Sequence, residues 1–110
     1  MNWRQLTSLS QLQEIKELSK DKPVAMFKHS TRCSISSMVK NRLESEWSFS
    51  DENLPIYYLD LLNHRDISAA IADQFSVTHA SPQLIVVKNS ESVYDNSHMS
   101  ISVSDIESLV

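Results

Sequence analysis

Hydrophobic residues along the chain change between a helical spacing and short continuous runs. In the first segment, leucine and isoleucine recur every three or four positions, which predicts a helix over roughly residues 9–20. The next apolar residues form an unbroken run, Val24–Phe27, which follows Pro23 and is typical of a buried central strand. The helical spacing then returns and predicts a second helix with an apolar face made of Ile35, Met38, Val39, Leu43 and Trp47.

The change of pattern is repeated in the middle of the chain. A mostly apolar segment over residues 54–61 predicts another buried strand. Asn63 with Asp66 is a plausible start for a third helix. The residues expected on the inner face of this helix are Ile67, Ala70, Ile71 and Phe75.

The last third of the chain has the pattern of a hairpin followed by a helix. An apolar strand over Gln83–Lys88 and a shorter strand around Val93–Tyr94 flank a turn at Asn89-Ser90, which is typical of an antiparallel pair. Ser104 with Glu107 has the spacing of a capping box and predicts a short terminal helix.

Polar residues at the starts of the first two helices predict how those helices are capped. Ser8 with Gln11 has capping-box spacing before the first helix. Ser30 or Thr31 is available to cap the second helix. The chain has no glycine, so its turns must be made by other residues such as Asn, Asp, Ser, Pro and Lys.

The predicted order is a βαβ unit followed by a ββα unit. Such an order favours an α/β protein with a central mixed sheet that is flanked by helices. We expect residues 1–110 to form one domain, because no repeat, low-complexity tract or linker divides the chain. Residues expected to share one core come from three adjacent strands: Val24, Met26, Ile56, Leu59, Ile85 and Val87.

Composition and charge exclude several classes of partner. Of the 110 residues, 41% are hydrophobic, which is enough for one core, and the net charge is −4. No basic run is present to neutralise a phosphate backbone, so we do not expect nucleic acid as a partner. No apolar stretch approaches the length of a membrane span or a signal peptide, so we expect no membrane association and a cytoplasmic location.

The chain has a single cysteine, Cys33, at the predicted junction between strand and helix. One cysteine excludes an internal disulfide and a cysteine-rich zinc site, and the four histidines form no zinc-binding motif, so we expect no metal. The thiolate is the nucleophile of thiol–disulfide exchange, and a helix N-terminus and a neighbouring cation both favour it. Cys33 has both features if the second helix starts here, because Arg32 is adjacent to it, and His29 would contribute if it faces the site. A small buried core cysteine is the alternative, which the polar surroundings of Cys33 disfavour.

Two segments together resemble the thioredoxin superfamily, in which an active cysteine begins the helix after a central strand and faces a cis-proline loop. More specifically, the segment Phe27–Ser36, the segment Val77–Gln83 with Ser81-Pro82, and the opening Asn2-Trp3 with Leu6 resemble the YtxJ-like monothiol bacilliredoxins. The resemblance covers essentially the whole chain. It implies a thioredoxin-like fold and a cis bond between Ser81 and Pro82.

The chain departs from the pattern of that family at two positions next to the cysteine. The family motif is of the Thr-Cys-Pro-Ile-Ser type, whereas this chain reads Arg32-Cys33-Ser34-Ile35-Ser36. Ser34 in place of proline restores an N–H group and lifts the restriction on φ. Ser36 stands where dithiol relatives carry a resolving cysteine, so the resemblance implies a monothiol mechanism.

The resemblance also implies a reaction and a set of site residues. The reaction is removal of bacillithiol, as thiol co-substrate, from S-bacillithiolated proteins through Cys33, with a second low-molecular-weight thiol completing the cycle. Ser81 would present its backbone to the incoming disulfide, and Pro82 would keep the loop open. The substrate site is expected to comprise Arg32, Ser34, Ser36, His79, Ser81 and Pro82.

Three other functions remain open at this point. A glutathione-dependent monothiol glutaredoxin would use the same cysteine with another thiol. A thioredoxin-like binding module would have lost the activity, and Ser34 would then mark that loss. An iron–sulfur carrier of the monothiol glutaredoxin type is a further alternative, but those proteins resemble a Cys-Gly-Phe-Ser motif and this chain has Cys-Ser-Ile-Ser.

Overall fold

The computed structural model describes residues 1–110, in which five strands alternate with helices. None of the helices has the length and apolar character needed to cross a membrane. In chain order the elements are β1 (Trp3–Gln5), α1 (Ser10–Leu18), β2 (Val24–His29), α2 (Ser34–Glu46), β3 (Ile56–Asp60), α3 (Arg65–Gln74), β4 (Gln83–Lys88), β5 (Glu91–Ser97), the 3₁₀ turn η1 (His98–Ser100) and α4 (Val103–Glu107).

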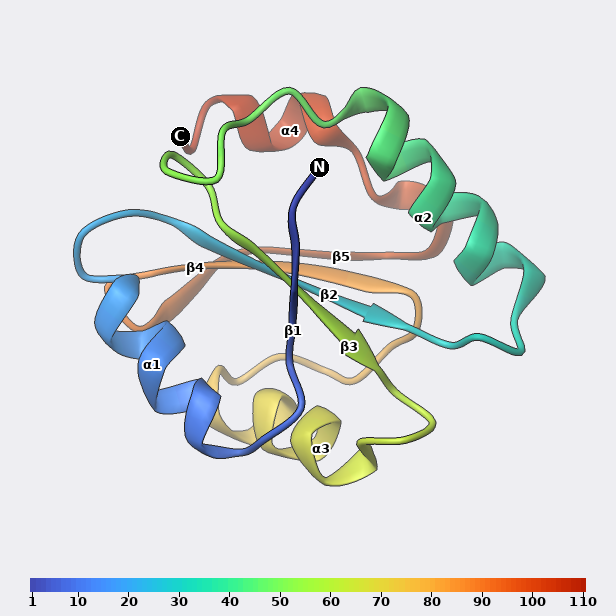
Figure 1. Ribbon diagram of the computed structural model, residues 1–110, viewed down its shortest axis with the longest axis horizontal. Coiled ribbons are helices and arrows are strands. Elements are labelled where there is room, and N and C mark those ends of the chain that lie inside the picture. Colours follow the sequence, from blue (N-terminus) through green and yellow to red (C-terminus); the bar gives the residue numbers. More distant parts are fainter.

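The five strands form one mixed sheet with the order β1-β3-β2-β4-β5. The strands β1, β3 and β2 are mutually parallel, whereas β4 runs antiparallel to both β2 and β5. In Figure 1, α1 and α3 cover one face of this sheet and α2 and α4 cover the other. The expected α/β fold with a mixed sheet flanked by helices is therefore confirmed.

Two hydrophobic clusters fill the spaces between the sheet and its two helical layers. The cluster beneath α1 and α3 contains five of the six residues that we expected to share a core, namely Val24, Met26, Leu59, Ile85 and Val87. The sixth residue, Ile56, lies in the cluster beneath α2 and α4, so its expected facing was wrong. Successive side chains of a strand point to opposite faces of the sheet. Ile56 lies three positions before Leu59 in β3, so these two side chains point to opposite faces.

The expected hairpin forms, and its second strand is longer than predicted. The turn residues Asn89 and Ser90 have positive φ values of 53° and 64°, as a two-residue turn of the primed type requires. The strand β5 spans Glu91–Ser97, and a bulge between Val86 and Val87 shifts its register against β4.

The predicted caps of α1 and α4 differ in the structure. At α1, the side-chain oxygen of Gln11 accepts a hydrogen bond from the backbone N–H of Ser8 at 3.0 Å, which is the Gln half of the expected capping box. At α4, Ser104 lies inside the helix, so the expected capping box with Glu107 is wrong. The helix begins at Val103, two residues earlier than a cap at Ser104 would place it, and Ser102 is the N-cap residue.

The strand β1 was not predicted from the sequence. Its three residues are too few for an alternating pattern, and the strand is defined by its pairing with β3, in which Trp3 lies opposite Ile56. The indole of Trp3 packs against the ring of Phe27 with centroids 5.7 Å apart, and thereby covers one edge of the second cluster.

Candidate active site

The candidate site is built where β2 ends and α2 begins. Cys33 is the N-cap residue of α2 and has extended backbone angles, φ −105° and ψ 118°. The backbone N–H of Ser37 donates to the Cys33 carbonyl at 3.1 Å, which closes the first turn of the helix. Neither Ser30 nor Thr31 caps α2, contrary to expectation, because the segment from residue 30 to 33 forms a turn in which the Cys33 N–H donates to the Ser30 carbonyl at 3.1 Å.

The electrostatic surroundings of Cys33 favour a negative charge. The helix that starts beside its thiol is 13 residues long and has no acidic side chain in its first turn. The N-terminal end of a helix carries a partial positive charge that stabilises a thiolate. Arg32 is exposed and makes no ion pair, so its charge is not neutralised by a carboxylate of the chain. Cys33 itself is partly exposed, as a nucleophile must be.

Ser36 anchors the first turn of α2 to the end of β2. Its hydroxyl lies 2.7 Å from Nδ1 of His29 and accepts a hydrogen bond from the backbone N–H of Ser30 at 3.1 Å. These two hydrogen bonds tie the end of β2 to α2 in either tautomer of His29. Ser36 has no exposed surface, so it does not face a substrate as we expected from the sequence; it holds the loop that carries Cys33.

His29 is a buried neutral group rather than the cation that the sequence led us to expect. Burial lowers the pKa of His29, and the ammonium of Lys40 lowers that pKa further, whereas Asp60 opposes both. The ring stacks on Phe27 at 6.0 Å and packs against Tyr58 at 5.7 Å. The cation nearest to Cys33 in the sequence is therefore Arg32, and the helix terminus lies at Cys33 itself.

The proline loop reaches the same edge of the sheet as Cys33. The bond between Ser81 and Pro82 is cis, as expected. Lys28 lies opposite Gln83 in the antiparallel pairing of β2 with β4, so the residues just before Gln83 lie beside the end of β2. The hydroxyl oxygen of Ser81 is buried without a hydrogen-bond partner, so its side chain is turned into the protein.

His79 lies on the opposite face of the sheet from His29. Its Nδ1 is 3.2 Å from the hydroxyl of Ser68 in α3 and 3.2 Å from the ammonium of Lys28. Burial and the charge of Lys28 both lower the pKa of His79. This histidine therefore belongs to a polar group under α3, at the end of the loop that leads to Ser81.

Lys28 is a buried cation that sequence reasoning missed. Its side chain has no exposed surface, and its ammonium also donates to the Ser68 carbonyl at 3.1 Å. Burial lowers the pKa of Lys28 to about 8, and Asp95 opposes this shift. Its position in the sequence could have predicted this burial. A lysine that directly follows the apolar run Val24–Phe27 belongs to the same central strand, so its side chain is buried with that strand.

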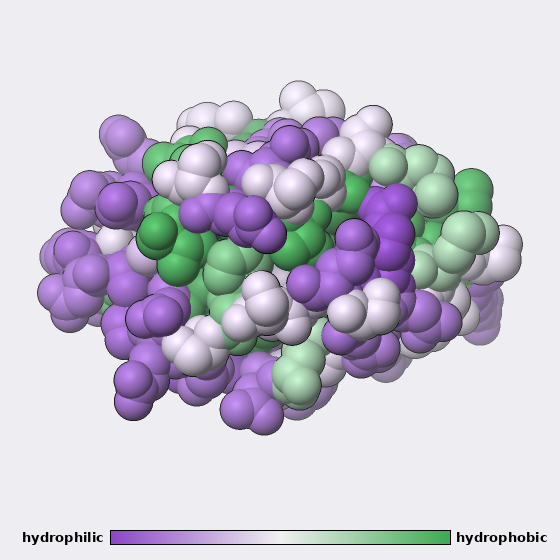
Figure 2. All heavy atoms as spheres, turned by 90° about the horizontal axis from the view of Figure 1, so that it is seen from above, coloured by the Kyte–Doolittle hydropathy of each residue, from purple (hydrophilic) through white to green (hydrophobic).

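Exposed apolar side chains surround the start of α2. Ile35 and Met38, which we expected to be on the buried face of this helix, are 42% and 53% exposed, and Met99 of η1 is 53% exposed. The buried face is formed instead by Ser36, Val39 and Leu43, since the hydrogen bonds of Ser36 fix the rotation of the helix. In Figure 2, apolar atoms gather at the end of the molecule where α2 begins.

Comparison with known proteins decides the family to which this chain belongs. The family model of the monothiol bacilliredoxin BrxC matches residues 4–106, which include the whole sheet beyond Trp3, Cys33 and the proline loop. The chain belongs to the monothiol bacilliredoxin family. Its sequence resemblance to that family is thereby confirmed.

Solved structures agree with a thioredoxin fold for this chain. An oxidoreductase with a thioredoxin fold is 30% identical, with a TM-score of 0.80 over 96% of this chain and 91% of the other. A thioredoxin of Malassezia sympodialis is 18% identical, with a TM-score of 0.71 over 97% and 86%. A thioredoxin of Schistosoma mansoni is 20% identical, with a TM-score of 0.68 over 98% and 94%. The similarity to the two thioredoxins shows only that this chain has the same fold. The similarity to the first structure also supports a redox function.

Proposed function

We propose that this member of the bacilliredoxin family removes bacillithiol from S-bacillithiolated cytoplasmic proteins by thiol–disulfide exchange at Cys33. The observation that carries the proposal is the position of Cys33, the sole cysteine, as the partly exposed N-cap of α2 at the edge of the sheet where the proline loop lies. The family match supports the choice of bacillithiol as the thiol.

The exchange has two steps that balance in sulfur and charge. The Cys33 thiolate attacks the bacillithiol sulfur of the mixed disulfide, so a bond forms between Cys33 and bacillithiol while the target protein leaves as a thiolate. A second bacillithiol, as thiolate, then attacks the bacillithiol sulfur on Cys33. This step gives bacillithiol disulfide and regenerates the Cys33 thiolate. An external thiol is needed because Ser36 cannot act as a resolving thiol.

The residues around Cys33 have distinct supporting roles in this proposal. Arg32 and the amides of the first turn of α2 stabilise the thiolate. Ser36 and His29 are positioning residues, since their hydrogen bond fixes the loop on which Cys33 lies. The backbone of Ser81 pairs with the incoming disulfide, and Pro82 keeps that backbone turned towards it. Ser34, at the start of α2, offers an N–H group to the substrate.

The choice of thiol is tested by turnover with matched substrates. One model protein is prepared with either bacillithiol or glutathione on the same cysteine, and each form is incubated with this protein and the corresponding free thiol. We expect multiple turnovers with bacillithiol and much slower release of glutathione. Equal turnover with glutathione would contradict the bacillithiol assignment and leave the monothiol mechanism standing. No transfer of either adduct to Cys33 would contradict both.

A further inference from the structure

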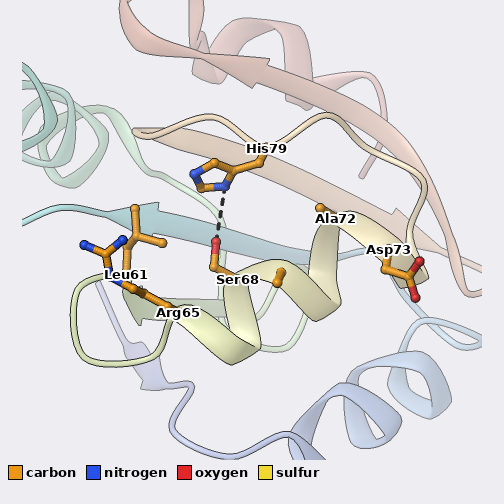
Figure 3. A pocket seen from close by; sticks show the side chains of 7 residues that line it. Leu61, Arg65, Ser68, Ala72, Asp73 and His79 are labelled. Carbon is orange, nitrogen blue, oxygen red and sulfur yellow. Dashed lines mark hydrogen bonds between the residues drawn. The ribbon is translucent and has the colours of Figure 1, made fainter.

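A pocket of about 560 Å³ lies between α3 and the chain that leads to the proline loop. Leu61 and Arg65 line one end of it, His79 and Ser68 line the middle, and Asp73 lies at the other end (Figure 3). Its volume is within the range of small-molecule sites.

The polar groups at the Arg65 end of the pocket are hydrogen-bond donors. An ammonium can only donate, so Nδ1 of His79 must accept from Lys28 at 3.2 Å. The proton of the neutral ring is therefore on Nε2, which is turned in Figure 3 towards the end of the pocket where Leu61 and Arg65 lie. The guanidinium of Arg65 adds further donors in a fork that matches a carboxylate.

Arg65 is the only cation that lines the pocket, and Lys28 lies behind His79. Neither Lys28 nor Arg65 takes part in an ion pair. Asp95 offsets part of the cost of burying the Lys28 charge, and an anion bound above His79 would offset more of it. The only acidic residue of the lining, Asp73, is at the opposite end.

We propose that the Arg65 end of this pocket binds a carboxylate of the low-molecular-weight thiol that is exchanged at Cys33. This inference rests on the proposed function, in which the thiol is bacillithiol. Bacillithiol carries a malate group, a dicarboxylate, joined to its cysteine through a sugar. Arg65 and the His79 Nε2–H donate to the carboxylate, and Lys28 holds His79 in the donating tautomer from below.

The chain connects the Leu61 end of the pocket to the segment that carries Cys33. The backbone N–H of Leu61 donates to the His29 carbonyl at 2.9 Å, which joins this end of the pocket to the end of β2. Cys33 follows His29 by four residues, which span at most about 14 Å even when fully extended. A sugar between thiol and carboxylates suits a separation of this order.

Binding of the carboxylate is tested with malate alone, using nuclear magnetic resonance of the intact reduced protein. We expect malate to shift the signals of Ser68, His79 and Arg65. Arg65→Gln should weaken binding by about tenfold or more, because a charge-assisted hydrogen bond is lost. Asp73→Asn should tighten binding, because it removes a repelling charge from the same pocket. Lys88→Gln, an exposed change at the opposite end of the sheet, should have no effect.

A transfer experiment separates the two possible sources of the carboxylate. The same model protein carries either bacillithiol or mercaptoethanol, which has no carboxylate. The rate of transfer to Cys33 is measured for each adduct, and the rate for bacillithiol is divided by the rate for mercaptoethanol. Arg65→Gln should lower this ratio, and Lys88→Gln should leave it unchanged. An equal effect of Arg65→Gln on both adducts would mean that acidic groups of the target protein occupy the pocket, which overturns the inference.

The inference and the proposed function fail in different ways. Absence of malate-induced shifts, or equal binding by wild type and Arg65→Gln, overturns the pocket even if Cys33 exchanges thiols. Absence of transfer from both adducts contradicts the proposed function, and malate binding then shows separately whether the pocket takes a dicarboxylate.

Discussion

Arg32 carries the one full positive charge next to Cys33 in the sequence, and it is exposed and unpaired. We expect Arg32→Glu to slow alkylation of Cys33 by iodoacetamide at neutral pH, because an adjacent negative charge disfavours the thiolate. Charges at exposed helix ends contribute about 0.3–1 kcal/mol, so a change of about two- to tenfold is expected at low salt. The rate is measured by intact mass, with Lys20→Glu as a distant control. An unchanged rate would show that the helix terminus dominates.

Lys28 lowers the stability of the folded protein in a manner that depends on pH. Below pH 8 the lysine is charged in both the folded and the unfolded chain, so the full cost of burying the charge is present. Because its pKa is lowered to about 8 in the fold and is about 10.4 in the unfolded chain, the unfolded chain binds more protons between these values. The free energy of unfolding should therefore gain a contribution as the pH rises through this window.

Replacing Lys28 with methionine tests this cost directly. We expect Lys28→Met to raise the free energy of unfolding at pH 7 by about 1–4 kcal/mol, because a buried charge that makes no salt bridge is replaced by an apolar side chain of similar length. The gain should shrink towards pH 10, where the wild-type lysine is largely neutral in the fold. Urea unfolding at both pH values measures it, with Lys88→Met as the exposed control. A loss of stability at pH 7 would contradict this account of Lys28.

At the scale of elements, the start of α2 can be tested by restoring the proline of the family motif. Ser34 is the first residue of α2, a position where proline loses no helical hydrogen bond. The residue before a proline must be extended, and Cys33 already is, with φ −105° and ψ 118°. We expect Ser34→Pro to raise the free energy of unfolding by about 0.5–1 kcal/mol, measured by urea unfolding. Destabilisation would show that the Ser34 N–H has a structural partner.

The elements that could be predicted from the sequence are those whose pattern is local. The strand after Pro23, the helix after Cys33 and the hairpin at Asn89-Ser90 each follow from the spacing of neighbouring residues. The strand β1 did not, because it is defined by pairing with a strand fifty residues away. The rotation of α2 about its axis was also missed, since it depends on the hydrogen bond between Ser36 and His29 and not on hydrophobicity.

At the scale of the whole molecule, the candidate site assembles from the ends of three strands. Cys33 follows β2, Leu61 and Arg65 follow β3, and Ser81 precedes β4, so all reach one edge of the sheet (Figure 1). The sequence predicted Cys33 and the proline loop because their neighbours form motifs. It did not predict the pocket under α3 or the contact of Lys28 with His79, which join segments 51 residues apart.

The central claim is that Cys33 accepts bacillithiol from a protein mixed disulfide, and the most direct measurement is intact mass spectrometry of that transfer. A model protein that carries bacillithiol is mixed with wild type or with Cys33→Ser. We predict that the wild type releases the thiol of the model protein and gains one bacillithiol at Cys33, whereas the variant does neither, because the chain has no other cysteine. Release of bacillithiol by Cys33→Ser at the wild-type rate would contradict the account.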